Sequence, residues 1–283
     1  EAAPPAGLPP AAWRTADLLD AAAMRDAVAA ARPGAIVHLA GQSSAARSFQ
    51  APAETFRANV LGTWHVLEAA RTAAPEARVL VIGSGEAYGP QPEGSRTGED
   101  TPFAPVSPYA LSKAAAESLA LAHARAHGLD VVCVRAFSHT GPGQDARFAI
   151  PGWARQIAAI ERGEAGPTLA VGNLDVVRDI GDVRDVARAY AALLERGRAG
   201  VAYNVCRGEG VSLADVARAL VDRARVPVEI VPDPARMRPA DVPWLVGDPA
   251  RLGADTGWWP EFTLARTLDD VLADWRSRAP SDG

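Results

Sequence analysis

The feature that most constrains this chain is the alternation of short apolar runs with longer helical segments. Three runs are apolar on both faces, as strands in the middle of a covered sheet are: residues 35–40, 78–82 and 129–137. Helical spacing or capping residues mark six other segments: residues 21–32, 56–71, 108–127, 182–196, 212–223 and 264–276. Strands alternating with helices predict an α/β fold with a doubly wound parallel sheet. Functional residues are then expected just beyond the carboxyl ends of the strands.

Composition narrows the class of protein. Apolar residues make up 48% of the 283, which is enough for a large core, and the net charge of −5 argues against a nucleic-acid binder. Cys133 and Cys206 lie in apolar runs without metal-binding spacing, so no metal site is expected. No apolar stretch approaches the ~18 residues of a membrane span, and no signal peptide is recognisable. These features predict a cytoplasmic protein that is not bound to a membrane.

Three residues have the spacing of an acid–base site. Tyr109 and Lys113 are four apart in the helix predicted at 108–127, so they lie one turn apart on one face. Ser84 follows the strand predicted at 78–82. A nearby ammonium lowers the pKa of a tyrosine, which otherwise titrates near ~10. Ser84, Tyr109 and Lys113 are therefore candidate catalytic residues for proton transfer at a carbonyl or carbinol.

Eight segments in order give this chain its resemblance to a known family. They are His38–Ser43, Asn59–Thr63, Gly83–Gly89, Ser107–Lys113, His139–Gln144, Val171–Leu174, Arg178–Asp185 and Arg238–Pro243. The chain resembles the extended short-chain dehydrogenases/reductases, in the branch of GDP-4-keto-6-deoxy-D-mannose reductases and GDP-mannose 4,6-dehydratases. The resemblance implies a Rossmann-like dinucleotide-binding domain at 1–142 plus 175–207. A smaller nucleotide-sugar-binding lobe is expected at 143–174 plus 208–283.

The resemblance also implies residue roles. The dinucleotide, NADP or alternatively NAD, is expected to contact Asp17, Leu18, Ala40, Gly41, Gln42, Tyr109, Lys113 and His139. Glu86 joins Ser84, Tyr109 and Lys113 as a catalytic residue. The nucleotide-sugar substrate is expected to contact Ser84, Glu86, Ser138, Asn173, Arg178, Arg238 and Asp241. Arginine suits the diphosphate because its guanidinium is planar and permanently charged. A homodimer is expected through the helices at 56–71 and 108–127.

Two departures from the family pattern affect these expectations. The family begins with a strand, a glycine-rich phosphate loop and a helix, and nothing before Asp17 fits that pattern. The first βαβ unit is therefore missing from this sequence, and we expect it to lie upstream of Glu1 rather than to have been lost. The second departure is Ser138, which stands where the family commonly has an asparagine that contacts substrate.

Three functions remain open at this stage. The first is NAD(P)H-dependent reduction of the C4 ketone of a 4-keto-6-deoxy nucleotide sugar, with GDP favoured as the nucleotide. The second is a nucleotide-sugar 4,6-dehydratase or epimerase, for which Glu86 would be the acid, although Gly85 replaces an acidic or hydroxyl residue common in dehydratases. The third is a non-catalytic sugar-nucleotide-binding protein without the phosphate loop.

Overall fold

The computed structural model describes residues 13–237 and 241–278, which divide into two compact units. The first unit holds the chain up to Gly83 together with Ser107–Val134 and Gly197–Ala202. The second unit holds Ser84–Val106, Arg135–Arg196 and the residues from Tyr203 onward. The functional domains expected from the resemblance follow other boundaries and remain a prediction.

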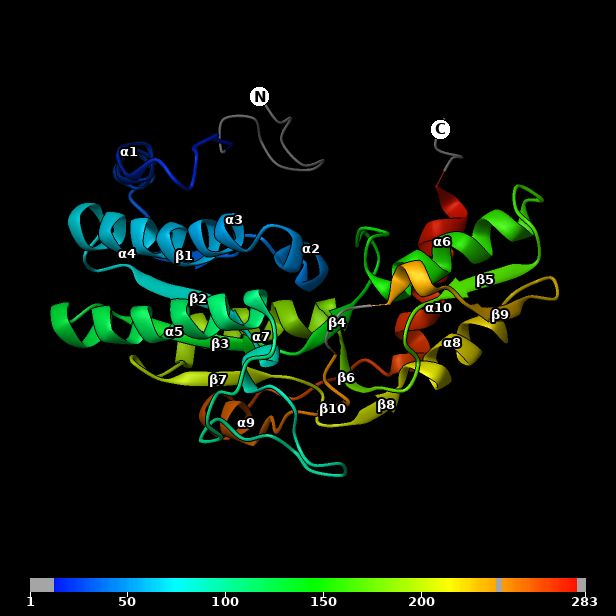
Figure 1. Cartoon of the computed structure of the whole chain (residues 1–283). Helices are drawn as coiled ribbons and strands as arrows, with labels where there is room; N and C mark the ends of the chain where they lie inside the picture. Colours follow the sequence, from blue (N-terminus) through cyan, green and yellow to red (C-terminus); the bar gives the residue numbers. More distant parts are fainter. Residues whose placement is uncertain (1–12, 238–240, 279–283) are drawn as a thin grey trace. The chain divides into compact units, whose positions relative to one another are not determined.

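The first unit contains most of the elements predicted in the N-terminal half (Figure 1). They are α1 (Ala21–Ala31), β1 (Ala35–His38), α2 (Ala45–Gln50), α3 (Pro52–Phe56), the π-helix η2 (Arg57–Leu61), α4 (Gly62–Ala73), β2 (Arg78–Ser84), α5 (Pro108–His127) and the start of β3 (Val131–Ala136). The single helix predicted at 56–71 is therefore a π-helical turn followed by an α-helix. The other predicted elements of this half are confirmed, with ends that differ by a few residues. The predicted burial of residues 35–40 on both faces is wrong, because β1 is the terminal strand of its sheet, and Val37 and Leu39 are 36% and 65% exposed.

Local capping explains where the helices of the first unit begin and end. Asp20 accepts hydrogen bonds from the backbone of Ala22 and Ala23, which fixes the start of α1. Ser107 caps α5, with Pro108 in the first turn, and Gly128 ends it in the left-handed conformation at φ 70°. Helix α1 ends at its C-cap Arg32, a non-glycine residue that adopts the left-handed conformation at φ 45°.

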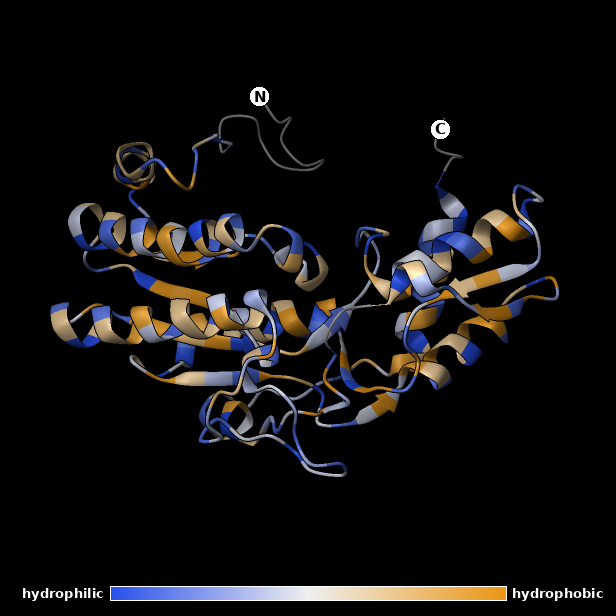
Figure 2. Ribbon diagram, in the orientation of Figure 1, coloured by the Kyte–Doolittle hydropathy of each residue, from blue (hydrophilic) through white to orange (hydrophobic). Residues whose placement is uncertain are grey.

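A compact apolar core holds α4 and α5 against the strands of the first unit. Its fully buried members include Leu67 of α4, Val79 of β2, Ala120 of α5 and Val131 of β3. Figure 2 shows most of β2 in the hydrophobic colour. A strand that is buried along nearly its whole length, as β2 is, has helices or other structure on both faces.

The second unit contains the remaining elements. They are η3 (Gly85–Tyr88), β4 (Ser138–Thr140), α6 (Ala149–Glu161), β5 (Thr168–Val171), β6 (Val177–Asp182), α7 (Val183–Arg196), β7 (Ala202–Val205), β8 (Gly210–Ser212), α8 (Leu213–Val221), β9 (Glu229–Pro232), η4 (Pro234–Arg236), β10 (Trp244–Leu245), α9 (Ala250–Thr256) and α10 (Leu264–Ser277). The three predicted helices at 182–196, 212–223 and 264–276 are confirmed as α7, α8 and α10.

The strands form three sheets in the described residues. The largest has the order β1-β2-β3-β7, with β1 parallel to β2 and Ala35 opposite Arg78. A second has the order β10-β6-β4, with β8 on β6, and β5 pairs in parallel with β9 in the third. The α/β fold with a parallel sheet is thus confirmed.

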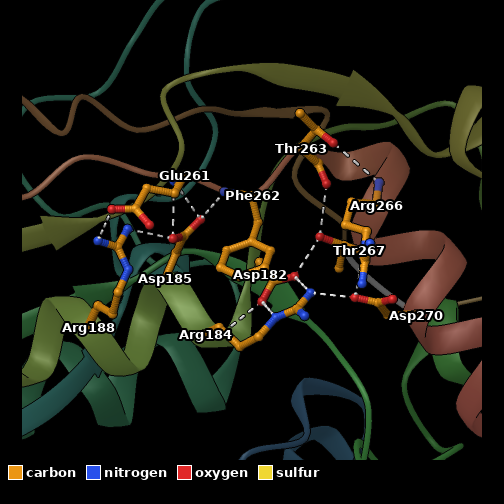
Figure 3. A network of polar contacts seen from close by, with 10 residues as sticks. All are labelled: Asp182, Arg184, Asp185, Arg188, Glu261, Phe262, Thr263, Arg266, Thr267 and Asp270. Carbon is orange, nitrogen blue, oxygen red and sulfur yellow. Dashed lines mark hydrogen bonds and ion pairs between the residues drawn. The ribbon is translucent and has the colours of Figure 1, made fainter.

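A buried acidic network joins the start of α7 to the segment that leads into α10 (Figure 3). Asp182 accepts a hydrogen bond from the Thr267 hydroxyl at 2.7 Å. Asp185 accepts from the backbone N–H groups of Glu261 at 3.1 Å and Phe262 at 3.0 Å. These carboxylates hold together chain segments more than 70 residues apart, so their role in the Arg178–Asp185 motif is architectural.

Candidate active site

Helix α5 places Tyr109 and Lys113 as the sequence predicts. Both side chains are partly buried, and they lie one helical turn apart. The Lys113 ammonium donates a hydrogen bond to the carbonyl oxygen of Ile82 on β2, at 2.8 Å. This contact fixes the lysine head group near the carboxyl end of β2, where ligands bind on parallel sheets.

Burial lowers the pKa of Lys113 from 10.5 to about 8. A lysine with such a pKa is still about nine-tenths protonated at pH 7. Lys113 therefore carries a positive charge beside Tyr109 at neutral pH, which is the charge needed to favour the phenolate. The Lys113 ammonium can also release its proton at mildly alkaline pH.

The loop at Ala40–Gln42 is held by a residue to which the sequence assigned no role. Asn59 accepts from the N–H of Gln42 at 2.8 Å and donates to the Gln42 carbonyl at 3.0 Å. Its amide also donates to the Ser112 hydroxyl at 2.9 Å, one residue before Lys113. A Cβ on Gly41, whose φ is 153°, would lie only 2.7 Å from the Asn59 oxygen, so this loop needs glycine there.

Gln42 uses its side chain within the same loop. Its amide donates to the Ser44 carbonyl and to the Thr55 hydroxyl, each at 2.9 Å. Because the side chain and both backbone groups of Gln42 are engaged, the backbone of Ala40 and Gly41 is the part of this loop best suited to contact a dinucleotide.

Asp17 and Leu18, expected at the adenine, precede α1. Asp17 accepts from the backbone N–H of Leu19 at 2.9 Å, and the Leu18 carbonyl accepts from the His65 ring of α4 at 2.9 Å. The Leu18 side chain occupies the space that a Cβ on Gly62 would need. Both residues thus sit on the first unit with fixed backbone positions.

A buried histidine on β1 is a second residue to which the sequence assigned no role. His38 shares a hydrogen bond with the Thr63 hydroxyl of α4 at 3.0 Å. Burial, and then the charge of Lys113, lower its pKa from 6.5 to about 4. His38 is therefore neutral at pH 7 and supports the strand that leads into the Ala40–Gln42 loop.

In the second unit, Ser84 is the last residue of β2, and Glu86 lies in the turn η3 that follows. The Ser84 hydroxyl accepts from the Glu86 N–H at 3.2 Å, so Ser84 caps η3. Ser84 is 6% exposed, whereas Glu86 is partly exposed. A Cβ on Gly85 would lie 3.0 Å from the Phe137 ring. Gly85 therefore packs closely against this ring, and a side chain here would require the ring to shift.

Ser138 and His139 follow Phe137 on the short strand β4. Ser138 pairs with Ile180 of β6, and His139 pairs with Gly181. Ser138 is exposed, while the His139 ring donates to the Phe137 carbonyl at 3.0 Å. The strand pairing fixes both backbones and leaves the Ser138 side chain accessible.

Three predicted substrate residues of the second unit lie together. Arg178 on β6 pairs with Asp241 at 2.5 Å, and the other oxygen of Asp241 accepts from the Asn173 amide at 3.4 Å. The side chains of Arg178 and Asp241 are 13% and 20% exposed. The partner of Arg178 is thus Asp241 rather than Asp179, its neighbour in sequence. Arg238 lies outside the described residues.

Asp179 has a structural role instead. Its carboxylate is fully buried and accepts from the backbone N–H groups of Arg207 at 2.7 Å and Gly208 at 2.8 Å. Burial raises its pKa to about 6, even though these hydrogen bonds oppose the shift. Asp179 thus organises the loop after β7 through contacts about 30 residues away in sequence.

The candidate catalytic residues are divided between the two units. Tyr109 and Lys113 belong to the first, and Ser84 and Glu86 belong to the second, as does His139, which is expected at the dinucleotide. Their action on one substrate, like the residue roles of the site in general, remains a prediction. An α/β fold with a Tyr-x-x-x-Lys helix whose lysine reaches the neighbouring strand defines the short-chain dehydrogenase/reductase class.

Comparisons with known proteins specify the class further. The profile of the GDP-mannose 4,6-dehydratase family matches residues 9–271. The chain is 43% identical over 247 residues to the GDP-6-deoxy-D-mannose reductase of Pseudomonas aeruginosa, covering 87% of this chain and 81% of that protein. The chain belongs to the GDP-mannose 4,6-dehydratase family, in the extended short-chain dehydrogenases/reductases that modify nucleotide sugars, as the resemblance predicted.

Solved structures agree with this assignment. The RMD protein of Pseudomonas aeruginosa, complexed with NADPH, has a TM-score of 0.87 and 40% identity, covering 94% of this chain and 87% of that chain. A dTDP-glucose 4,6-dehydratase from Streptomyces venezuelae with NAD bound has a TM-score of 0.81 and 28% identity, covering 92% and 78%. In residues 13–237 and 241–278, no helix combines the length and apolarity that crossing a membrane requires.

Proposed function

We propose that this chain reduces the C4 ketone of a GDP-linked 4-keto-6-deoxy sugar, with NADPH as the hydride donor. The observation that carries the proposal is the 43% identity to a GDP-6-deoxy-D-mannose reductase over 87% of the chain. The Lys113 contact with β2 supports it, because it fixes a charged lysine one turn from Tyr109. NAD is the second choice of cofactor, since a related dehydratase structure contains it.

The first unit suits a dinucleotide. Gly41 carries no side chain, and Asn59 holds the backbone of the adjoining loop in a fixed path. Asp17 and Leu18 would bind the adenine end, and Lys113 the nicotinamide ribose. When bound, NADPH supplies the hydride for C4 of the sugar.

The proton for the new hydroxyl is assigned to Tyr109. Its phenol would donate to the oxygen at C4 as negative charge develops there. The charge of Lys113 would stabilise the phenolate that this step leaves, and Ser84 would donate a hydrogen bond to the oxygen at C4. Glu86 and His139 would orient the hexose and the nicotinamide.

The substrate diphosphate is assigned to Arg178 and Arg238. The pair of Arg178 with Asp241 aligns the guanidinium, and Asp241 with Asn173 offers acceptors and donors for the nucleotide ribose. Ser138, exposed on β4, would contact the sugar.

The test is NADPH oxidation by the purified protein with GDP-4-keto-6-deoxymannose. Turnover that disappears in Tyr109→Phe is the expected result. Micromolar NADPH binding by calorimetry without any turnover would contradict reduction, and the absence of both would favour a non-catalytic sugar-nucleotide-binding protein.

A dehydratase is the second candidate, because the acid Glu86 lies two residues after Ser84, in the turn that follows β2. The packing of Gly85 against Phe137 argues against it, since a larger acidic or hydroxyl residue would not fit at Gly85 without a shift of the ring. Conversion of GDP-mannose without added cofactor would favour the dehydratase over the reductase.

We also propose that the protein forms a homodimer and lies in the cytoplasm. Leu61, Trp64 and Leu111 are 39%, 39% and 48% exposed around the helices expected to pair, so a homodimer would cover them. A cytoplasmic location suits Cys133 and Cys206, which are buried free thiols. Sedimentation of the purified protein tests the dimer.

A further inference from the structure

Two histidines lie one turn apart at the end of α5, away from the residues assigned to the reaction. His123 is 3% exposed, and His127 is exposed to solvent. Their ring centroids are 4.5 Å apart. Residues at i and i+4 share one face of a helix, which is the spacing that lets two imidazoles bind one metal ion.

Glu68 of α4 completes this cluster. Helix α4 packs beside α5 (Figure 1), and one ligand atom from each of Glu68, His123 and His127 lies within 4.8 Å of the others. The His123 Nε2 and the Glu68 Oε1 are 2.6 Å apart.

The carboxylate is held in place by hydrogen bonds. The Arg71 guanidinium donates to both of its oxygens, and His123 contacts Oε1. A carboxylate with the usual pKa near ~4 is ionised at neutral pH. Arg71 contacts the Glu68 Oε2 at 2.8 Å. At neutral pH Glu68 therefore offers an ionised oxygen, as a metal ligand must, while Arg71 restrains its rotamer and reduces its net attraction for a cation.

We propose that Glu68, His123 and His127 bind one divalent cation of the zinc class, which joins α4 to α5. Two imidazoles and one carboxylate are the donor set that zinc prefers over magnesium or calcium, and three protein ligands leave the fourth position for water. Bonds of about 2.0–2.2 Å fit ligand atoms that lie this close together after small side-chain adjustments. The ion would replace the hydrogen bond between His123 and Glu68, and exposed His127 provides access from solvent.

This site differs from the expectation that the chain has no metal site. That expectation rested on linear motifs. Here the third ligand comes from a helix 55 residues earlier in the sequence than His123. The His-x-x-x-His pair alone is a weak signal, and the packing of α4 on α5 adds the carboxylate.

The test is calorimetric titration of the tag-free, chelator-treated chain with zinc chloride, with magnesium chloride as the comparison. One zinc ion per chain at micromolar affinity, and no magnesium binding, are expected. Cobalt should give the visible absorption of a four-coordinate site. Copper should quench Trp64, whose ring lies 5.1 Å from His123, so Trp64→Phe should lose most of the quenching.

The primary variant is His127→Ala, because that side chain is exposed and its removal leaves the core intact. It should weaken zinc binding at least about tenfold, since even outer-shell partners commonly contribute that much. Glu68→Gln should do the same, whereas Arg125→Ala, an exposed change on the same helix, should leave binding unchanged. Zinc binding of equal affinity in wild type and His127→Ala, or no binding by the wild type at millimolar zinc, overturns the proposal.

Discussion

The Asn59 amide donates a hydrogen bond to the Ser112 hydroxyl at 2.9 Å, and the same side chain holds both backbone groups of Gln42. Asn59 lies in the π-helical turn η2 and is 2% exposed. Single π-turns inside helices occur often at functional sites, because they change the direction of one side chain. Here the turn lets Asn59 connect the Ala40–Gln42 loop with the helix that carries Lys113.

Replacing this side chain should loosen the loop. Asn59→Ala leaves the Gln42 N–H and C=O without their partner, which should cost about 1–3 kcal/mol of stability. The dissociation constant for NADPH should rise as well, because the loop is no longer fixed before binding. Urea unfolding and calorimetry measure the two effects. Arg57→Ala, an exposed change in the same turn, is the control, and equal NADPH affinity in both variants would contradict the role of Asn59.

Removing the phenolic hydroxyl should stop proton transfer without disturbing the fold. Tyr109→Phe should lower kcat by about 10²–10⁴-fold, which is the usual contribution of a positioned general acid. Binding of NADPH should be largely retained. Steady-state kinetics and NADPH titration separate these effects, and a variant with near wild-type kcat would mean that another group protonates the substrate.

The lowered pKa of Lys113 predicts a pH dependence of catalysis. Lys113 is charged below its pKa of about 8 and loses that charge as the pH rises through it. The pKa of Tyr109 is then no longer held down, so kcat/KM for reduction should fall above about pH 8. In Lys113→Arg the charge persists, so a slower enzyme without this alkaline limb is expected. A limb unchanged in that variant would assign it to a different group.

Local signals in the sequence account for much of the fold. Ser107, Pro108 and Gly128 bound α5 as predicted, because capping needs only neighbouring residues. The positions of Tyr109 and Lys113 on one face of α5 could be predicted for the same reason, since helical periodicity alone places residues four apart on the same face.

Contacts between segments that are far apart in the chain could not be predicted from the sequence. The pairing of Arg178 with Asp241 joins residues 63 positions apart, and no local pattern predicts it. The π-turn that orients Asn59 has no signature in local propensity, and the burial that sets the pKa of Lys113 depends on the packed core. The unassigned Asn59 did stand in a motif of the family, which was the one available signal.

The acidic network at the start of α7 predicts a large loss of stability from one substitution. The Asp185 side chain is 3% exposed and accepts from two backbone N–H groups and from Arg188. Asp185→Ala leaves these partly buried donors without their acceptor, at a cost of about 1–3 kcal/mol. Glu195→Ala, which changes an exposed side chain of the same helix, should stay within about 0.5 kcal/mol of wild type. Equal denaturant midpoints for the two variants would be inconsistent with this network holding α7 to the later segment.

Burial of His38 predicts that stability falls in mild acid. Its pKa is about 4 in the folded protein and 6.5 as the reference value, so the unfolded chain takes up this proton first as the pH falls. The stability contributed above pH 6.5 is therefore lost between about pH 6.5 and 4, by up to about 3 kcal/mol from this group. His38→Gln can keep a hydrogen bond to Thr63 but cannot titrate. The difference in unfolding free energy between wild type and variant should shift in favour of the variant as the pH is lowered, and parallel curves from pH 7 to 4 would show that His38 does not cause the loss.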